Sequence, residues 1–159
     1  MPKPEINIEI KRSIKLDVDK NRLEEVVRKV LEIERSGTSV ELGLLVTDDK
    51  TVRKLNRMYR GEDETTDVLS FQMISKEPEM SELPFISAPD GIRHLGEVVI
   101  SYPQAVKQAQ ERAHGISREV ALLIVHGTLH LLGYDHESAD DELRMREKES
   151  QILSSLEVV

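Results

Sequence analysis

Apolar and polar positions predict four short strands in this chain, and two of them show a clear alternation. Ile6, Ile8 and Ile10 alternate with polar residues, and an apolar residue recurs at every second position from Val40 to Val46. A period of two predicts a strand with one buried face. Residues 66–71 and 95–101 are rich in strand-forming residues and are predicted as two further strands.

Five other stretches are predicted as helices. Some repeat their apolar residues every three or four positions, whereas the stretch from Val120 to Leu132 is almost wholly apolar and predicts a buried helix. Capping residues, proline and glycine mark the helix ends. The start and stop residues of the five predicted helices are Asp19 and Gly37, Asp48 and Gly61, Pro103 and Gly115, Ser117 and Gly133, and Ser138 and Leu156.

The predicted order is therefore β-α-β-α-β-β-α-α-α. We expect an α+β fold, a small, mostly four-stranded mixed sheet with about five helices, as a single domain over residues 1–159. Residues 76–92 contain three prolines and no clear period, which predicts a mobile flap.

Composition narrows the chemistry that this domain can carry. There is no cysteine, so any metal site must use nitrogen and oxygen ligands. No apolar run is long enough for a membrane span and the N-terminus lacks a signal-peptide core, so a cytoplasmic location is expected. The net charge of −8 argues against broad nucleic-acid binding unless a local basic patch overrides it.

Three of the five histidines fall within the eleven residues HGTLHLLGYDH, from His126 to His136. On a helix, His126 and His130 project from the same side, within about 6 Å of each other. Gly133 permits a left-handed turn that would bring His136 to a third coordination position. This spacing predicts one zinc ion per chain with an open position for water, although helix-end histidines can also bind backbone carbonyls.

The same spacing matches the peptidase frame H-E-x-x-H-x-x-G-x-x-H, except that Gly127 replaces the glutamate. That glutamate is the general base of the peptidases, so its loss counts against peptide hydrolysis. We interpret Gly127 as allowing close approach of a neighbouring element or of substrate. Asp135 is either a residue that orients a zinc ligand or a turn former.

HGTLHLLGYDH closely resembles the signature H-G-x-L-H-L-x-G-Y-D-H of the YbeY family of bacterial endoribonucleases. The blocks LNRMYRG (residues 55–61), TDVLSF (66–71) and LGEVVI (95–100) resemble that family's blocks in the same order. The resemblance covers roughly residues 40 to 137.

This resemblance implies a zinc-dependent, single-strand-specific endoribonuclease that acts in maturation of the 3′ end of small-subunit (16S) ribosomal RNA and in ribosome quality control. It implies that His126, His130 and His136 are the zinc ligands and gives Arg60 a functional role. Glu97 stands where family members often have aspartate, which preserves a carboxylate for a supporting role around the metal site.

A run of basic residues independently favours an anionic substrate such as single-stranded RNA. It consists of Lys50, Arg53, Lys54, Arg57 and Arg60. It is either a solvated helix face or a phosphate-steering surface, with Lys54 and Arg57 as substrate contacts. Arg60 either holds a phosphate or pairs with Glu62, Asp63 or Asp67. Aromatic residues make up only 3%, so base stacking is expected to contribute little.

The leading hypothesis is phosphodiester hydrolysis of single-stranded RNA, with the small ribosomal subunit as partner and the general base unassigned. One alternative is a metallopeptidase-like hydrolase on the same histidine frame. The other is a noncatalytic ribosome-associated factor stabilised by zinc. Three protein ligands count against the latter, because structural zinc usually has four.

Overall fold

One sheet of four strands organises the structure, a computed structural model that describes residues 4–37, 39–72, 92–134 and 138–157. The strands are β1 (Glu5–Ile10), β2 (Val40–Thr47), β3 (Val68–Gln72) and β4 (Arg93–Ser101), in the spatial order β1-β2-β4-β3. β1, β2 and β4 are parallel, and β3 runs antiparallel to β4. Within the described residues, β3 is therefore an edge strand.

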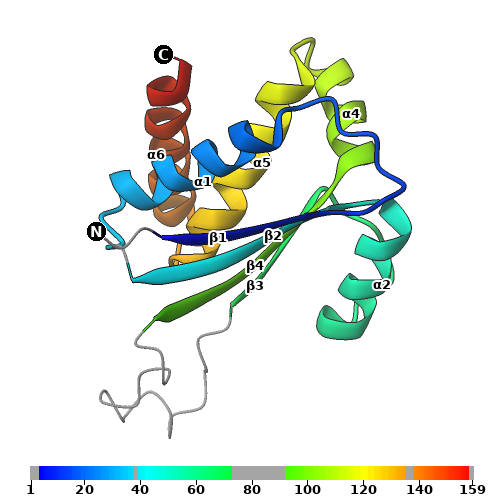
Figure 1. Cartoon of the computed structure of the whole chain (residues 1–159), viewed down its shortest axis with the longest axis horizontal. Helices are drawn as coiled ribbons and strands as arrows, with labels where there is room; N and C mark the ends of the chain where they lie inside the picture. Colours follow the sequence, from blue (N-terminus) through cyan, green and yellow to red (C-terminus); the bar gives the residue numbers. More distant parts are fainter. Residues whose placement is uncertain (1–3, 38, 73–91, 135–137, 158–159) are drawn as a thin grey trace, which may run out of the picture.

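Helices cover both faces of this sheet unequally (Figure 1). On one side lie α1 (Lys20–Ile33), α4 (Tyr102–Glu111), α5 (Ile116–Leu131) and α6 (Ala139–Glu157). The short helix α2 (Asp49–Arg60) lies alone on the opposite side. The described residues thus confirm the expected α+β fold, with a four-stranded mixed sheet and five helices.

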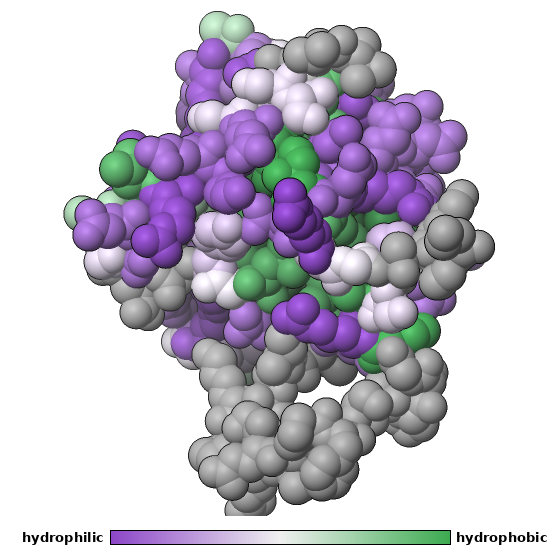
Figure 2. Space-filling view, turned by 90° about the vertical axis from the view of Figure 1, so that its left-hand side faces the viewer, coloured by the Kyte–Doolittle hydropathy of each residue, from purple (hydrophilic) through white to green (hydrophobic). Residues whose placement is uncertain are grey.

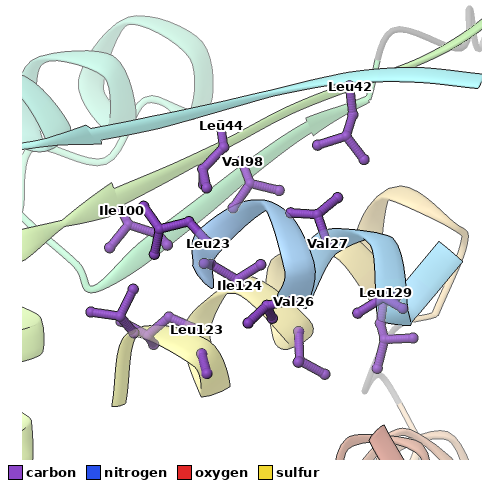
Figure 3. Close-up of a cluster of buried hydrophobic side chains, with 14 of the residues drawn as sticks. Leu23, Val26, Val27, Leu42, Leu44, Val98, Ile100, Leu123, Ile124 and Leu129 are labelled. Carbon is purple, nitrogen blue, oxygen red and sulfur yellow. The ribbon is translucent and has the colours of Figure 1, made fainter. Parts of the chain in front are cut away.

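The main hydrophobic core lies between the sheet and helices α1 and α5. Leu42 and Leu44 of β2 point toward Val27 of α1 and Ile124 of α5 (Figure 3). Figure 2 shows one end of the molecule, where a group of hydrophobic residues is surrounded by hydrophilic ones. A smaller cluster under α2 contains Val52, Leu69 and Val99. Since α5 is buried over most of its length, it has little freedom to move relative to the sheet.

Three predicted helix starts are confirmed by capping hydrogen bonds. Asp19, Asp48 and Ser138 each accept a backbone N–H of the first turn, at 2.9, 2.8 and 3.1 Å. The prediction that Ser117 caps α5 is wrong, because α5 begins at Ile116 and Gly115 is its N-cap. The earlier start places the side chain of Glu119 inside the protein, where it pairs with Arg112 and His114 at 2.9 and 2.7 Å.

Two predicted glycine stops are also displaced. α1 ends at Ile33 and α4 at Glu111, ahead of Gly37 and Gly115. The left-handed turns are made by Arg35 (φ 52°) and Ala113 (φ 53°). Backbone hydrogen bonds at 3.0 and 3.1 Å from the following residues back to the helix offset the strain of these turns.

The remaining two glycine stops are confirmed, since Gly61 (φ 72°) and Gly133 (φ 104°) both adopt positive φ. Among the described residues, no helix is both long and apolar enough to cross a membrane. The predicted flap at residues 76–92 lies, apart from Ile92, outside the described residues.

Candidate metal centre

His126 and His130 lie one turn apart near the C-terminal end of α5, as the sequence predicts. Their Nε2 atoms are 3.1 Å apart, and the two rings meet nearly edge to face, with centroids separated by 4.6 Å. Both residues are half-buried, whereas most of their helical neighbours are fully buried. The buried helix therefore holds two imidazole nitrogens together at one point on its surface.

Glu149 of α6 orients one of these rings. Its Oε1 lies 2.6 Å from Nδ1 of His126, and its side chain is only 17% exposed. An ionised carboxylate can only accept a hydrogen bond, so the proton of His126 belongs on Nδ1. A neutral His126 then presents an unprotonated Nε2 toward His130, which is the form that binds a metal ion.

Glu149 is not among the site residues predicted from the sequence. A signal was present, because Glu149 lies on the same side of α6 as Met145, Ile152 and Leu156, at spacings of four, three and four. The other three residues of this stripe are buried and apolar. A carboxylate within such a stripe needs a buried partner, and His126 supplies it.

Gly127 lets the sheet approach α5 closely. A Cβ atom at this position would lie 2.6 Å from Cγ1 of Val98 and 3.2 Å from Oγ of Ser70. The expectation that Gly127 allows a neighbouring element to approach is confirmed, and the neighbours are β3 and β4. There is no room here for the glutamate of the peptidase frame.

Two hydrogen bonds from β3 fix the backbone that carries the histidines. Oγ of Ser70 donates to the carbonyl of Gly127 at 3.0 Å, and Nε2 of Gln72 donates to the carbonyl of His130 at 3.1 Å. Ser70 thus contacts the helix that carries the site. Asp67 lies farther along and accepts a hydrogen bond from Gln108 of α4 at 3.1 Å.

The chain turns sharply where α5 ends. Besides the positive φ of Gly133, the backbone N–H of Tyr134 donates to Leu129 O at 3.1 Å. Burial, reinforced by a hydrogen bond with Glu34, raises the pKa of Tyr134 to about 12. The next three residues, which include the predicted third ligand His136 and its neighbour Asp135, lie outside the described residues. Within the described ones, no group of three metal-ligating side chains is assembled.

The basic residues lie on α2, across the sheet from the histidines (Figure 1). Lys54, Arg57 and Arg60 are exposed, and Arg60 makes no hydrogen bond or ion pair with any described residue. Arg53, in contrast, binds both carboxylate oxygens of Asp63 at 2.9 and 3.2 Å, which lowers the pKa of that carboxyl. The proposed partners Asp63 and Asp67 are thus engaged elsewhere.

Glu97 is not brought to the histidine pair. It follows Gly96 in β4 and lies on the face opposite to Val98, with its Cγ 3.3 Å from the position of a Cβ on Gly43. Since Val98 faces α5, the side chain of Glu97 is directed away from that helix. The other two histidines pair elsewhere, His94 with Glu41 and His114 with Glu119.

Known proteins share the sequence and architecture of this chain. The family model described as Endoribonuclease YbeY matches residues 6–157. A protein of that name from Roseiflexus sp. (strain RS-1) is 45% identical over 140 residues, which cover 87% of this chain and 84% of the relative. Another from Desulforamulus reducens is 44% identical over 144 residues, which cover 89% and 90%.

The fold also matches a solved structure. The solution structure of a protein from Thermotoga maritima superimposes with a TM-score of 0.58 at 25% identity, covering 94% of this chain and 86% of that one. The family match spans every strand and helix described above except the first residue of β1, and it includes the histidine pair. This chain therefore belongs to the endoribonuclease YbeY family.

Proposed function

We propose that this protein is a zinc-dependent endoribonuclease that cuts single-stranded RNA in the cytoplasm. Its proposed role is maturation of the 3′ end of small-subunit ribosomal RNA and ribosome quality control. The observation that carries the proposal is the convergence of two imidazole Nε2 atoms beside a carboxylate, in a chain of the endoribonuclease YbeY family.

The residues fit a zinc ion. Two imidazole nitrogens on one tetrahedral zinc are separated by about 3.3 Å, given bonds of about 2.0–2.1 Å. The 3.1 Å between the Nε2 atoms of His126 and His130 is close to that separation. Imidazoles suit zinc, and the sequence offers His136 as third ligand, which leaves a fourth position open.

Each side chain then has a separate task. When bound, zinc supplies Lewis acidity and lowers the pKa of water. Glu149 keeps the His126 proton on Nδ1, so that Nε2 remains a ligand. Lys54 and Arg57 attract the phosphate backbone, and Arg60 holds the scissile phosphate and stabilises the charge that develops on its oxygens.

Gly127 distinguishes this proposal from the peptidase alternative. The position of the peptidase base is filled by Val98 and Ser70, so no carboxylate can stand there without displacing the sheet. Peptide hydrolysis on the same frame would need another base, and nothing in the described site favours it.

The test compares zinc content and cleavage of an unstructured RNA for four variants. His130→Ala should lose both zinc and activity. Arg60→Ala should retain zinc and lose about 100-fold or more in kcat, as expected for removal of a group that stabilises developing charge. His94→Ala and Lys107→Ala are matched controls for loss of a histidine and of an exposed cation, and both should behave as wild type.

The products also identify the attacking group. Attack by water leaves a 5′-phosphate and a 3′-hydroxyl, whereas attack by the ribose 2′-hydroxyl leaves a cyclic phosphate. Intact RNA with zinc-loaded protein would refute the ribonuclease proposal. Cleavage of a peptide instead would support the peptidase, and a zinc-dependent fold without any cleavage would support a noncatalytic ribosome factor.

A further inference from the structure

Tyr59, at the end of α2, is the most exposed large hydrophobic residue that the structure describes. It is 66% exposed, and its neighbour Met58 is 59% exposed. One exposed aromatic residue needs no explanation by itself. Tyr59 differs because its ring also packs on Phe71 of β3, at 5.4 Å between centroids and 59° between planes. The ring is therefore supported by the sheet and still largely open to solvent.

The charges on the same helix select the kind of partner. Arg53, Arg57 and Arg60 recur at i, i+4 and i+7, so they share one side of α2, whereas Tyr59 projects from the side that carries Val52 and Leu55. Lys54 adds an exposed cation, and Asp63 pairs with Arg53 and also interacts electrostatically with Arg57. In a protein of net charge −8, α2 therefore carries a local basic surface and, at its end, an exposed aromatic ring. Phosphates and planar bases together match it, as single-stranded nucleic acid provides.

The edge strand β3 connects this surface to the histidine pair. Phe71 points toward Tyr59 on one face of the sheet, and the next residue, Gln72, binds the carbonyl of His130 on the other. Because β3 is the last strand on its side of the described sheet, both faces meet around this edge (Figure 1). An RNA strand that contacts both α2 and His130 would therefore pass this edge, at Phe71 and Gln72.

We propose that Tyr59, supported by Phe71, is a stacking platform for a nucleobase of the bound RNA, close to the phosphate that Arg60 holds. The proposal rests on the ribonuclease function proposed above and adds a base-binding subsite to it. It revises the expectation, drawn from composition, that base stacking contributes little to RNA binding. One exposed aromatic residue is enough to stack a base when it lies on a helix that also carries phosphate-binding cations.

The test measures KM and kcat for an unstructured RNA of about 12 nucleotides, within the range that single-strand binding surfaces cover. Tyr59→Ala should raise KM about 5- to 10-fold with little change in kcat, since the ring contacts a base and not the reacting atoms. Tyr59→Phe retains the ring and should behave as wild type. Tyr59→Leu retains apolar packing on Phe71 but has no aromatic face, so it should resemble Tyr59→Ala.

Two further readouts separate stacking from charge and from folding. The slope of log KM against log salt should be unchanged in Tyr59→Ala, whereas Arg57→Ala should lose about one phosphate contact from it. A series of RNAs carries one abasic nucleotide at successive positions. For wild type, KM should rise at one of these positions, by the same factor by which Tyr59→Ala raises it. At that position the abasic nucleotide should have no further effect on the variant.

The platform is refuted if Tyr59→Ala has wild-type KM, if Tyr59→Phe is as weak as Tyr59→Ala, or if the abasic penalty persists in the variant. A change of oligomeric state in Tyr59→Ala would instead assign the surface to contact with a second copy of the chain. Failure of wild type to bind and cut RNA would refute the proposed function itself, so the two failures are distinguishable.

Discussion

Glu149 orients His126 for the proposed zinc site. It holds Nδ1 of His126 from a different helix, at 2.6 Å. Carboxylates in this position fix the tautomer and the ring orientation of metal-binding histidines. In this chain the carboxylate comes from α6, 23 residues along the sequence from the histidine it serves.

We expect Glu149→Gln to weaken zinc binding by about 10- to 100-fold, because the amide is a poorer acceptor and does not fix the histidine tautomer. Competition with a chromophoric chelator measures this affinity without reference to activity. Glu147→Gln, on the exposed side of the same helix, is the matched control. Equal zinc affinity of Glu149→Gln and wild type would contradict the role assigned to Glu149.

Gly127 is required by packing. Gly127→Ala gains up to about 1 kcal/mol of helix propensity. The added Cβ, however, would be 2.6 Å from Val98, and such overpacking typically costs about 1–3 kcal/mol. We therefore expect a net loss of stability, measured by urea unfolding.

A Val98→Ala, Gly127→Ala double variant tests the steric origin of that loss. Removing Cγ1 of Val98 should make the glycine substitution less costly than it is in the wild-type background. Strict additivity of the two substitutions would argue that Gly127 is needed for another reason.

An ion pair between Lys11 and Asp48 links the end of β1 to the start of α2. Lys11, just after β1, binds Asp48, the N-cap of α2, at 2.7 Å and also contacts Thr51. The hydrogen bond from Lys11, followed by those from Thr51, lowers the pKa of Asp48 from 3.8 to about 2. This pair places the start of the basic helix against the sheet.

The lowered pKa makes this ion pair sensitive to acid. A group whose pKa is depressed in the folded state stabilises it above the unfolded pKa, and that contribution is lost as the pH falls through the folded pKa. Asp48→Asn retains a good N-cap but loses the charge. It should be slightly less stable than wild type near neutral pH, and the difference should vanish between about pH 4 and pH 2.

Urea unfolding at several pH values checks this, and the effect should shrink with added salt because the pair is partly exposed. Lys11→Met should lose the same pH-dependent contribution. A stability difference that is constant over the whole pH range would show that Asp48 acts only through its capping hydrogen bond.

The complete fold places the two proposed functional surfaces on either side of the same edge strand. The histidine pair lies where α5, α6 and β3 meet, and the basic surface with Tyr59 lies on the other side of β3. Zinc at the histidines would therefore stabilise the packing of α5 and α6 as well as supply the chemistry.

Saturating zinc should raise the melting temperature of wild type. A ligand at 100 times its Kd stabilises the folded state by about 2.7 kcal/mol, which is a shift of roughly 5–10 °C for a chain of this size. His130→Ala should show no comparable shift, whereas His94→Ala should retain it. An equal shift in His130→Ala would place the zinc elsewhere.

The family resemblance and most elements could be predicted from the sequence because their signals are local. Alternation along β1 and β2 and the spacing of His126 and His130 depend on residues within a turn or a strand. Helix and strand geometry alone converts such spacings into a shared face. Asp19, Asp48 and Ser138 capped helices for the same reason.

Contacts between distant segments depended on packing. Glu149 reaches His126 because α6 packs on α5. Tyr59 contacts Phe71 because α2 lies against the edge strand. Glu97 faces away from α5 because Val98, the next residue of β4, packs against that helix. No local period encodes which surfaces come together, since that choice is made by burial of the whole core. The histidine pair could thus be predicted from the sequence. The carboxylate that supports it, and the position of the basic surface relative to it, could be found only in the folded molecule.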